Sequence, residues 1–281
     1  MLMNLTKRII LLLLVAVSLS SLFGCTFARR CVSALRSTSH FIPHKNDPRV
    51  LFEPGAKDYA NKVVTFLPSA IQQVEEKQYR SFAKPVRVYI CASRESFRRM
   101  YGADVRAGVL TKLFLSPRVF NEKDEILKMY LNHELSHLHL LQQLGIYKNS
   151  RLPFWFTEGL ATYTSGGGGA HTVSREQAID FIKSGRHFVP NESGGFIFQK
   201  TPSDFALKPH MFYRQSMMFV EFLASLNQSA FQKFLLAIEE GAPLTRALEQ
   251  EYKKDLNELF GKFLNLINAN LAAKLVGGRL S

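Results

Sequence analysis

The sequence predicts an α+β fold, with a small sheet in the first half of the chain and helices through most of the second half. Residues 85–91 alternate apolar and polar side chains as a strand does, and residues 109–115 form a second apolar run. After residue 122, apolar residues recur mostly at helical spacing. The 281 residues, 46% of them hydrophobic, suffice for a sizeable core. We therefore expect one globular domain over residues 51–281, with an α+β part to residue 170 and a helical part from residue 171.

The first 24 residues have the plan of a secretory signal peptide. Lys7 and Arg8 precede an apolar run over residues 9–17, and small polar residues then lead to Cys25. A glycine directly before this cysteine resembles the bacterial lipobox, which implies that Cys25 takes a lipid and becomes the mature N-terminus. By the same resemblance, Thr26 favours the outer membrane where the host has one. Ordinary cleavage or an uncleaved anchor are the alternatives, although three serines interrupt the apolar span that an anchor needs.

The segment that follows is basic and polar, so we expect residues 25–50 to form a lipidated tether between membrane and domain. The chain has 36 Lys and Arg against 23 Asp and Glu, a net charge of +13 that becomes +11 without residues 1–24. An exported basic protein is expected to meet anionic lipid, an anionic cell-envelope polymer or an acidic protein, and we expect no nucleic-acid partner. A charge that serves solubility alone is the alternative. We expect Cys31 and Cys91 to be unpaired thiols.

The remaining elements follow from local signals along the chain. An amphipathic helix is expected over residues 56–80, interrupted or restarted near Pro68, before the strand at 85–91. A short helix over 94–101 ends at Gly102, and the second strand follows at 109–115. Further helices are expected near residues 174, 210–226, 229–240, 243–251 and 254–273.

The strongest helical signal covers residues 122–144. Asn121 is a favourable N-cap, three acidic residues occupy the first turn, and Gly145 ends the apolar pattern. Another helix begins at Pro153, a favoured first-turn residue, and runs to the four glycines at 166–169. We expect these glycines to form a mobile loop, either a lid over a site or an ordinary connection.

The helix at 122–144 contains the motif HELSH. His133 and His137 lie four residues apart, so both can direct a ring nitrogen toward one ion, as two zinc ligands do. Glu134 lies beside such an ion, where it can take a proton from a water molecule. His139 points about 200° away from His137 and is not expected to be a ligand. The pattern arises by chance roughly once in a hundred chains of this composition, so a core helix that happens to hold histidines is the alternative.

A catalytic zinc site needs a third protein ligand and one open position. Glu158, in the stretch WFTEGLA, lies on the next expected helix, 21 residues after His137. Trp155 and Thr162 share its helical face, which argues against the alternative of a solvated glutamate. The sequence therefore predicts His133, His137 and Glu158 as the ligand set.

The motif HELSH followed by W-x-x-E-G-x-A resembles the gluzincin zinc metallopeptidases, and more closely the bacterial peptidase MA-like group, over residues 58–270. The resemblance implies a zincin-like (thermolysin-like) fold with a small mixed sheet, and one Zn²⁺ per chain held by the three predicted ligands, with Glu134 as the base. Family enzymes also offer a downstream tyrosine or histidine to the oxyanion. Tyr213, in Y-x-x-S, resembles that tyrosine, and His210 is the other candidate. Both can equally be ordinary helix residues.

These expectations together describe a bacterial cell-envelope protein, lipid-anchored, that hydrolyses peptide bonds in a peptide or protein substrate. Zinc-activated water would be the nucleophile and Glu134 the general base. Two alternatives stay open. One is a lipid-anchored binding or assembly protein with a structural or inactive metal site, and the other is a zinc hydrolase that acts on cell-wall peptides.

Overall fold

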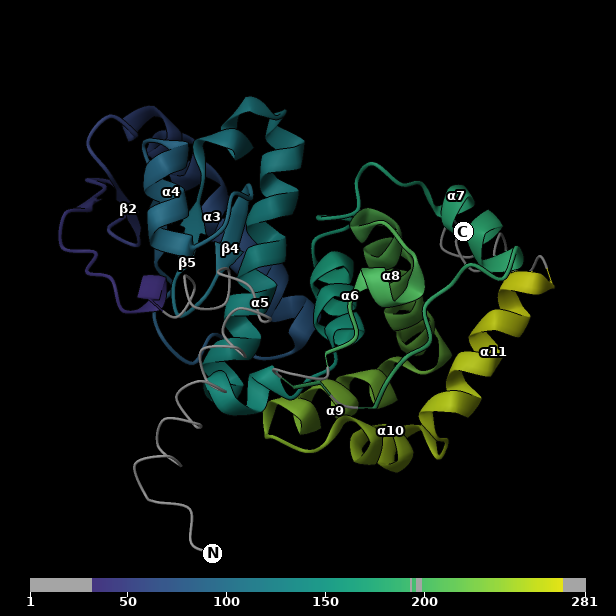
Figure 1. The fold of residues 1–281 in the computed structure, drawn as a ribbon. Coiled ribbons are helices and arrows are strands. Elements are labelled where there is room, and N and C mark those ends of the chain that lie inside the picture. Colours follow the sequence, from purple (N-terminus) through teal and green to yellow (C-terminus); the bar gives the residue numbers. More distant parts are fainter. Residues whose placement is uncertain (1–31, 193, 196–198, 270–281) are drawn as a thin grey trace, which may run out of the picture. The chain divides into compact units, whose positions relative to one another are not determined.

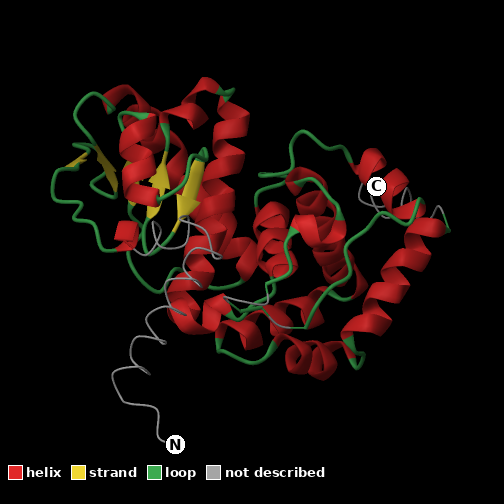
Figure 2. Cartoon of the chain, in the orientation of Figure 1, coloured by secondary structure: helices red, strands yellow, loops and turns green. Residues whose placement is uncertain are grey.

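The computed structural model describes residues 32–192, 194–195 and 199–269, and within them the fold is mixed α+β. Helices dominate, and all five strands belong to one small sheet (Figures 1 and 2). Contacts divide the chain into two compact units. The first unit comprises residues up to 62 and residues 87–121, and the second comprises residues 63–86 and residues from 122 onward. The expected signal peptide, Cys25 and Cys31 lie outside the described residues.

The first unit contains the sheet, whose strand order is β1-β2-β3-β5-β4. The strands are β1 (Ile42–Pro43), β2 (Val50–Phe52), β3 (Val88–Ile90), β4 (Ala107–Val109) and β5 (Leu113–Leu115). β2, β3 and β5 run parallel in register, while β1 and β4 are antiparallel edge strands. The sheet is therefore mixed, as expected, and its central strands β3 and β5 are fully buried.

Two local expectations differ from the structure in this unit. The apolar run at 109–115 is not one strand, because residues 110–112 turn the chain between β4 and β5. The turn residues Leu110, Thr111 and Lys112 include none of the Gly, Pro, Asn or Asp residues that usually mark a turn, so the sequence pattern hid the hairpin. The expected tether is also shorter than 25–50, since β1 and β2 already belong to the sheet. β2 buries Val50, and β1, although exposed, pairs with β2 along the backbone, so sheet pairing outweighs the polar composition of the segment around them.

Helix α4 (Arg94–Tyr101) has the boundaries that its sequence predicts. The Ser93 side chain accepts a hydrogen bond from the Ser96 amide, and Gly102 ends the helix in the left-handed conformation at φ 88°. Its buried side chains join an apolar cluster that includes Phe41, Tyr89, Cys91 and Phe114. Cys91 is a buried free thiol, and burial raises its pKa.

The second unit is helical and contains the predicted motif. The chain division falls within α3 (Lys57–Gln78), which runs through Pro68 without a break. The later helices are α5 (Asp124–Ser150), α6 (Phe154–Thr164), α7 (Arg175–Lys183), α8 (Pro209–Leu226), α9 (Gln228–Glu239), α10 (Leu244–Tyr252) and α11 (Leu256–Asn268). Most lie within a few residues of their predicted bounds.

Helix α5 differs from its prediction at both ends. Asn121 does not cap it, because residues 117–121 form a short 3-10 helix, and Lys123 stands at the N-cap position without a side-chain cap. Asp124 and Glu125 in the first turn complement the helix dipole instead. Gly145 breaks the helical backbone as predicted, at φ 71° and ψ 170°, but a further helical segment follows it to Ser150.

The core of the second unit is built largely from aromatic side chains. Trp155 and Phe156 of α6 lie in one apolar cluster with Phe188 and with Phe212 and Phe219 of α8. All five side chains are buried. α6 and α8 form the most extensive helix pair in the described chain. This apolar support fixes α6, and with it the side chains that α6 directs toward α5. Among the described residues, no helix combines the length and apolar character needed to cross a bilayer.

Candidate metal centre

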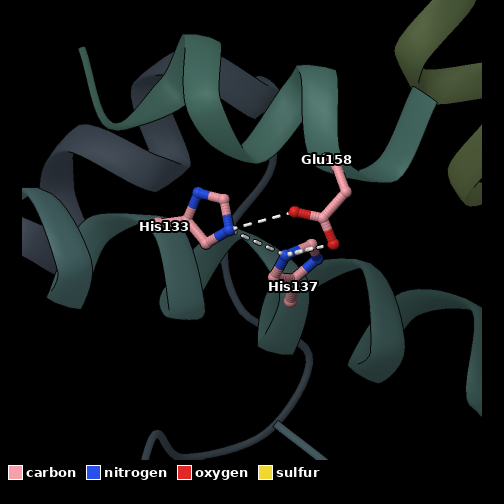
Figure 3. Close-up of side chains that lie close together, drawn as sticks. All are labelled: His133, His137 and Glu158. Carbon is pink, nitrogen blue, oxygen red and sulfur yellow. Dashed lines mark hydrogen bonds and ion pairs between the residues drawn. The ribbon is translucent and has the colours of Figure 1, made fainter. Parts of the chain in front are cut away.

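Helices α5 and α6 bring three potential metal ligands together in the second unit. His133 and His137 project from successive turns of α5, and Glu158 reaches them from α6 (Figure 3). The donor atoms of all three lie within 4.8 Å of one another. The His133 side chain is 6% exposed and that of Glu158 11%, whereas that of His137 is 21% exposed. The group is thus buried but keeps some solvent access at His137.

Glu158 reaches the histidines because α6 lies unusually close to α8. A Cβ atom on Gly159 would come within 2.8 Å of the backbone oxygen of Ser216, so only glycine allows this approach. Trp155, one turn earlier, is buried and donates a hydrogen bond from Nε1 to the backbone oxygen of Asn191 at 2.9 Å. In the WFTEGLA motif, the Trp therefore anchors α6 and the Glu supplies the carboxylate. The Gly leaves room for the close approach of α8.

The spacing of the donor atoms fits a tetrahedral ion. Nε2 of His133 lies 3.2 Å from Nε2 of His137 and 3.3 Å from Oε2 of Glu158, and Nε2 of His137 lies 3.6 Å from Oε1 of Glu158. Tetrahedral ligands that are each about 2.0 to 2.1 Å from zinc are about 3.3 to 3.4 Å apart. Two imidazoles and a carboxylate also form a donor set typical of catalytic zinc. The three residues can therefore hold a single metal ion.

Electrostatics hold the three side chains together as a charged cluster. Burial alone would raise the pKa of Glu158, but the imidazoles of His137 and His133 outweigh it and lower that pKa to about 2. Burial would likewise lower the pKa of His137, but the attraction of Glu158, with a smaller contribution from Glu134, raises it. A metal ion binds the neutral imidazole, so binding must displace a proton wherever His137 is protonated.

The other two ionisable side chains of residues 133–139 lie in different places. Glu134 is buried, and its charge acts on His137, which places its carboxylate beside the group. His139 points away, as its helical position predicts. Its Nε2 lies 2.8 Å from the backbone oxygen of Arg80 and its Nδ1 lies 3.4 Å from Glu239. His139 is therefore part of a separate buried polar cluster.

Three of the four glycines at 166–169 pack against other segments, and Gly169 lies directly against the metal group. Gly167, Gly168 and Gly169 are buried. A Cβ on Gly169 would come within 3.0 Å of Cε1 of His133 and 3.2 Å of Cδ2 of Tyr213. Nδ1 of His133 is buried and has no hydrogen-bond partner within the described part of the chain. Packing by Gly169 and Tyr213 therefore orients this imidazole, in place of the hydrogen bond that metal-binding histidines usually make.

The two residues proposed for the oxyanion differ in their surroundings. The Tyr213 ring stacks beside that of His133, with centroids 6.3 Å apart and an interplanar angle of 30°. His210 instead bonds the hydroxyl of Thr172 through Nδ1, and its ring lies 5.2 Å from that of His171. The structure thus brings the Tyr213 ring beside the predicted ligand His133, and it brings His210 to Thr172 and His171.

Sequence reasoning missed two residues near the group. The His171 ring lies between two other rings: its centroid is 5.2 Å from that of His210 and 5.6 Å from that of Tyr130. Tyr130 stands one helical turn before His133. Arg214 reaches from α8 to the segment after the glycines, where its Nε donates to the backbone oxygen of Val173 at 2.8 Å. One of its terminal nitrogens donates to the oxygen of Ala170 at 3.2 Å. The only sequence signal for Arg214 is its position directly after Tyr213.

Comparison with known proteins adds no identification. No family model matches the chain, and a search of curated proteins finds no match. The His133, His137 and Glu158 group is therefore assigned as a possible metal site on its geometry and donor chemistry alone.

Proposed function

We propose that the protein is a zinc-dependent metallopeptidase of the zincin-like, gluzincin type, exported and anchored to the cell envelope by a lipid on Cys25. The observation that carries the proposal is the spacing of His133, His137 and Glu158, whose donor atoms lie 3.2 to 3.6 Å apart. Three protein ligands leave one position of a tetrahedral site for water or substrate, as catalytic zinc requires.

A zinc ion held by these ligands would polarise the scissile carbonyl and lower the pKa of water. Glu134 would take the proton of the attacking water and pass it to the leaving amine. Its buried carboxylate acts electrostatically on His137, so it lies beside the reacting atoms in this scheme. Tyr213, stacked against His133, is the proposed donor to the oxyanion.

The experiment that tests this function replaces Glu134 by Gln. This variant should retain zinc but lose about 10²- to 10⁴-fold in turnover, because the ligands remain and the base is removed. Turnover is measured on a mixture of fluorogenic peptides, with chelation and zinc restoration of the parent alongside. Glu125→Gln, at an exposed position of the same helix, is the control. Near-normal turnover in Glu134→Gln would remove Glu134 from the mechanism.

A binding or assembly role with a structural metal is the second candidate. It predicts zinc content without any hydrolysis that depends on Glu134. A structural zinc site usually has four protein ligands, whereas the group found among the described residues has three. A hydrolase specific for cell-wall peptides would cleave purified peptidoglycan but not unfolded protein, so both substrates belong in the assay.

A further inference from the structure

The basic charge of this protein is unevenly distributed between its two compact units. In the first unit, the described residues 32–62 and 87–121 contain 12 Lys and Arg against 5 Asp and Glu, a net charge of +7. The described residues of the second unit contain 18 of each, a net charge of zero. Over these described residues, the excess of positive charge therefore lies in the unit with the sheet and not in the unit with the metal group.

Within the first unit, basic and apolar side chains are exposed side by side at the C-terminal end of α4. Ser33 donates a hydrogen bond from Oγ to the backbone oxygen of Arg99 at 2.9 Å, which fixes the turn at residues 32–36 against α4. Arg98 and Arg99 are exposed on the last turn of the helix. Val32 is 56% exposed and Leu35 88%. Together with Arg36, which is also exposed, these residues form what we call the basic patch: Val32, Leu35, Arg36, Arg98 and Arg99.

Two of the three acidic groups around α4, Asp104 and Glu53, are engaged elsewhere, and only Glu95, in the first turn of α4, is exposed beside the three arginines of the patch. Asp104 forms ion pairs with both Arg94 and Arg118, so two arginines share one carboxylate. Glu53 lies 3.1 Å from His40, accepts from the amide of Ala92 at 2.8 Å and bonds the hydroxyl of Ser96. The basic patch therefore retains an excess of positive charge toward solvent.

The patch also lies where the chain leaves the membrane in the proposed arrangement. Six residues separate Cys25 from Val32, which is the first described residue. Even when fully extended, the seven steps from Cys25 to Val32 span at most about 25 Å. A lipid on Cys25 would therefore keep the patch within two to three Debye lengths of the headgroups at physiological ionic strength.

We propose that the basic patch docks on the surface of a bilayer that contains anionic phospholipid. The three arginines contact lipid phosphates, and Val32 and Leu35 enter the headgroup region between them. This arrangement fits the exposure of two apolar side chains beside the three arginines better than a soluble polyanion does. Docking fixes the first unit at the membrane. The inference rests on the proposed lipid anchor but not on peptide hydrolysis.

The test measures amide hydrogen exchange of the full chain in bilayers of phosphatidylcholine alone or mixed with phosphatidylglycerol. Peptides that cover residues 32–36 and 95–106 should exchange more slowly only with phosphatidylglycerol, and high salt should reverse the effect. Arg98→Gln with Arg99→Gln should lower the ratio of docked to free patch about 25-fold, because each arginine near an anionic surface contributes about a fivefold factor.

Two control variants separate charge from structure. Arg98→Lys with Arg99→Lys keeps both charges and should retain the protection. Lys233→Gln with Arg246→Gln removes two exposed charges from the second unit and should change nothing. Equal exchange in the two bilayers, or full protection in the Gln variant, would overturn the proposal. Protection by soluble polyphosphate without a bilayer would also overturn it, in favour of an anionic polymer.

The anchor is judged separately in the same samples. A chain that does not stay with pure phosphatidylcholine bilayers lacks the anchor, whatever its peptidase activity. The patch is then judged by whether phosphatidylglycerol vesicles still bind the chain and whether the Gln variant abolishes that binding. Binding that depends on Arg98 and Arg99 supports the patch without the anchor, and binding that does not depend on them overturns it.

Discussion

Gly169→Ala tests whether the glycine segment orients the metal ligand His133. Gly169 has φ +80°, so alanine there costs about 1 to 2 kcal/mol of backbone strain. The added Cβ would also lie 3.0 Å from Cε1 of His133 and 3.2 Å from the Tyr213 ring, closer than ordinary contact. The imidazole must therefore shift by a few tenths of an ångström. Because changes in the groups that orient a ligand typically lower metal affinity 10- to 100-fold, we expect a loss of that size for zinc.

Gly166→Ala is the matched control, because Gly166 has a similar φ of +68° but no atom within 4 Å of its Cβ position. It should lose about the same 1 to 2 kcal/mol from backbone strain without moving a ligand. Zinc affinity is measured by competition with a chromophoric chelator, and the free energy of unfolding of the zinc-free protein is measured in urea. Equal zinc affinity in the two variants would refute the role of Gly169, since strain alone would then explain both.

Three further predictions concern charge and positioning. Burial raises the pKa of Glu239 to about 8, although an arginine lies beside it. The folded chain therefore keeps a proton that the unfolded chain has lost between about pH 4.5 and 8. The free energy of unfolding should fall by a few kcal/mol as the pH rises through this range, and Glu239→Gln should flatten the decline in urea melts at pH 5 and 8. If the free energy of unfolding declines just as much in Glu239→Gln, other groups cause the decline. Arg214→Met should lower zinc affinity about tenfold, because the segment after the glycines loses the two hydrogen bonds by which Arg214 clamps it. The far-ultraviolet circular dichroism should stay native. A zinc affinity equal to the parent's would count against this clamp. Because Glu158 raises the pKa of His137, zinc binding should release a proton and should weaken as the pH falls through that pKa. Calorimetry in buffers of different ionisation enthalpy measures the proton release. A binding enthalpy that does not depend on the buffer would contradict this prediction.

The sequence predicts the parts of this structure that depend on local periodicity. His133 and His137 share a face because an α-helix places residues four apart on one side, and the acidic start of α5 and its Gly145 break are visible in the sequence. The α+β class also agrees with expectation. These features need no knowledge of which segments meet in space.

Other features depend on tertiary contacts and could not be predicted in the same way. The hairpin between β4 and β5 is hidden because its turn, residues 110–112, contains no Gly, Pro, Asn or Asp. The glycines at 166–169 suggest mobility when seen alone, yet three of them are buried against other segments. The clamp by Arg214 exists only because α8 lies alongside the segment that it holds. In each case the partner lies far away in the sequence.

The most direct test of the account measures zinc content per chain in the parent and in Glu158→Gln. The structure brings Glu158 within 3.6 Å of both histidine nitrogens, so removal of its charge should cost most of the bound zinc. Glu249→Gln, at an exposed helical position, should match the parent. The account predicts close to one zinc per parent chain and clear loss in Glu158→Gln alone. A parent that binds no zinc after gentle purification and zinc addition would contradict it and return the two histidines to a structural role.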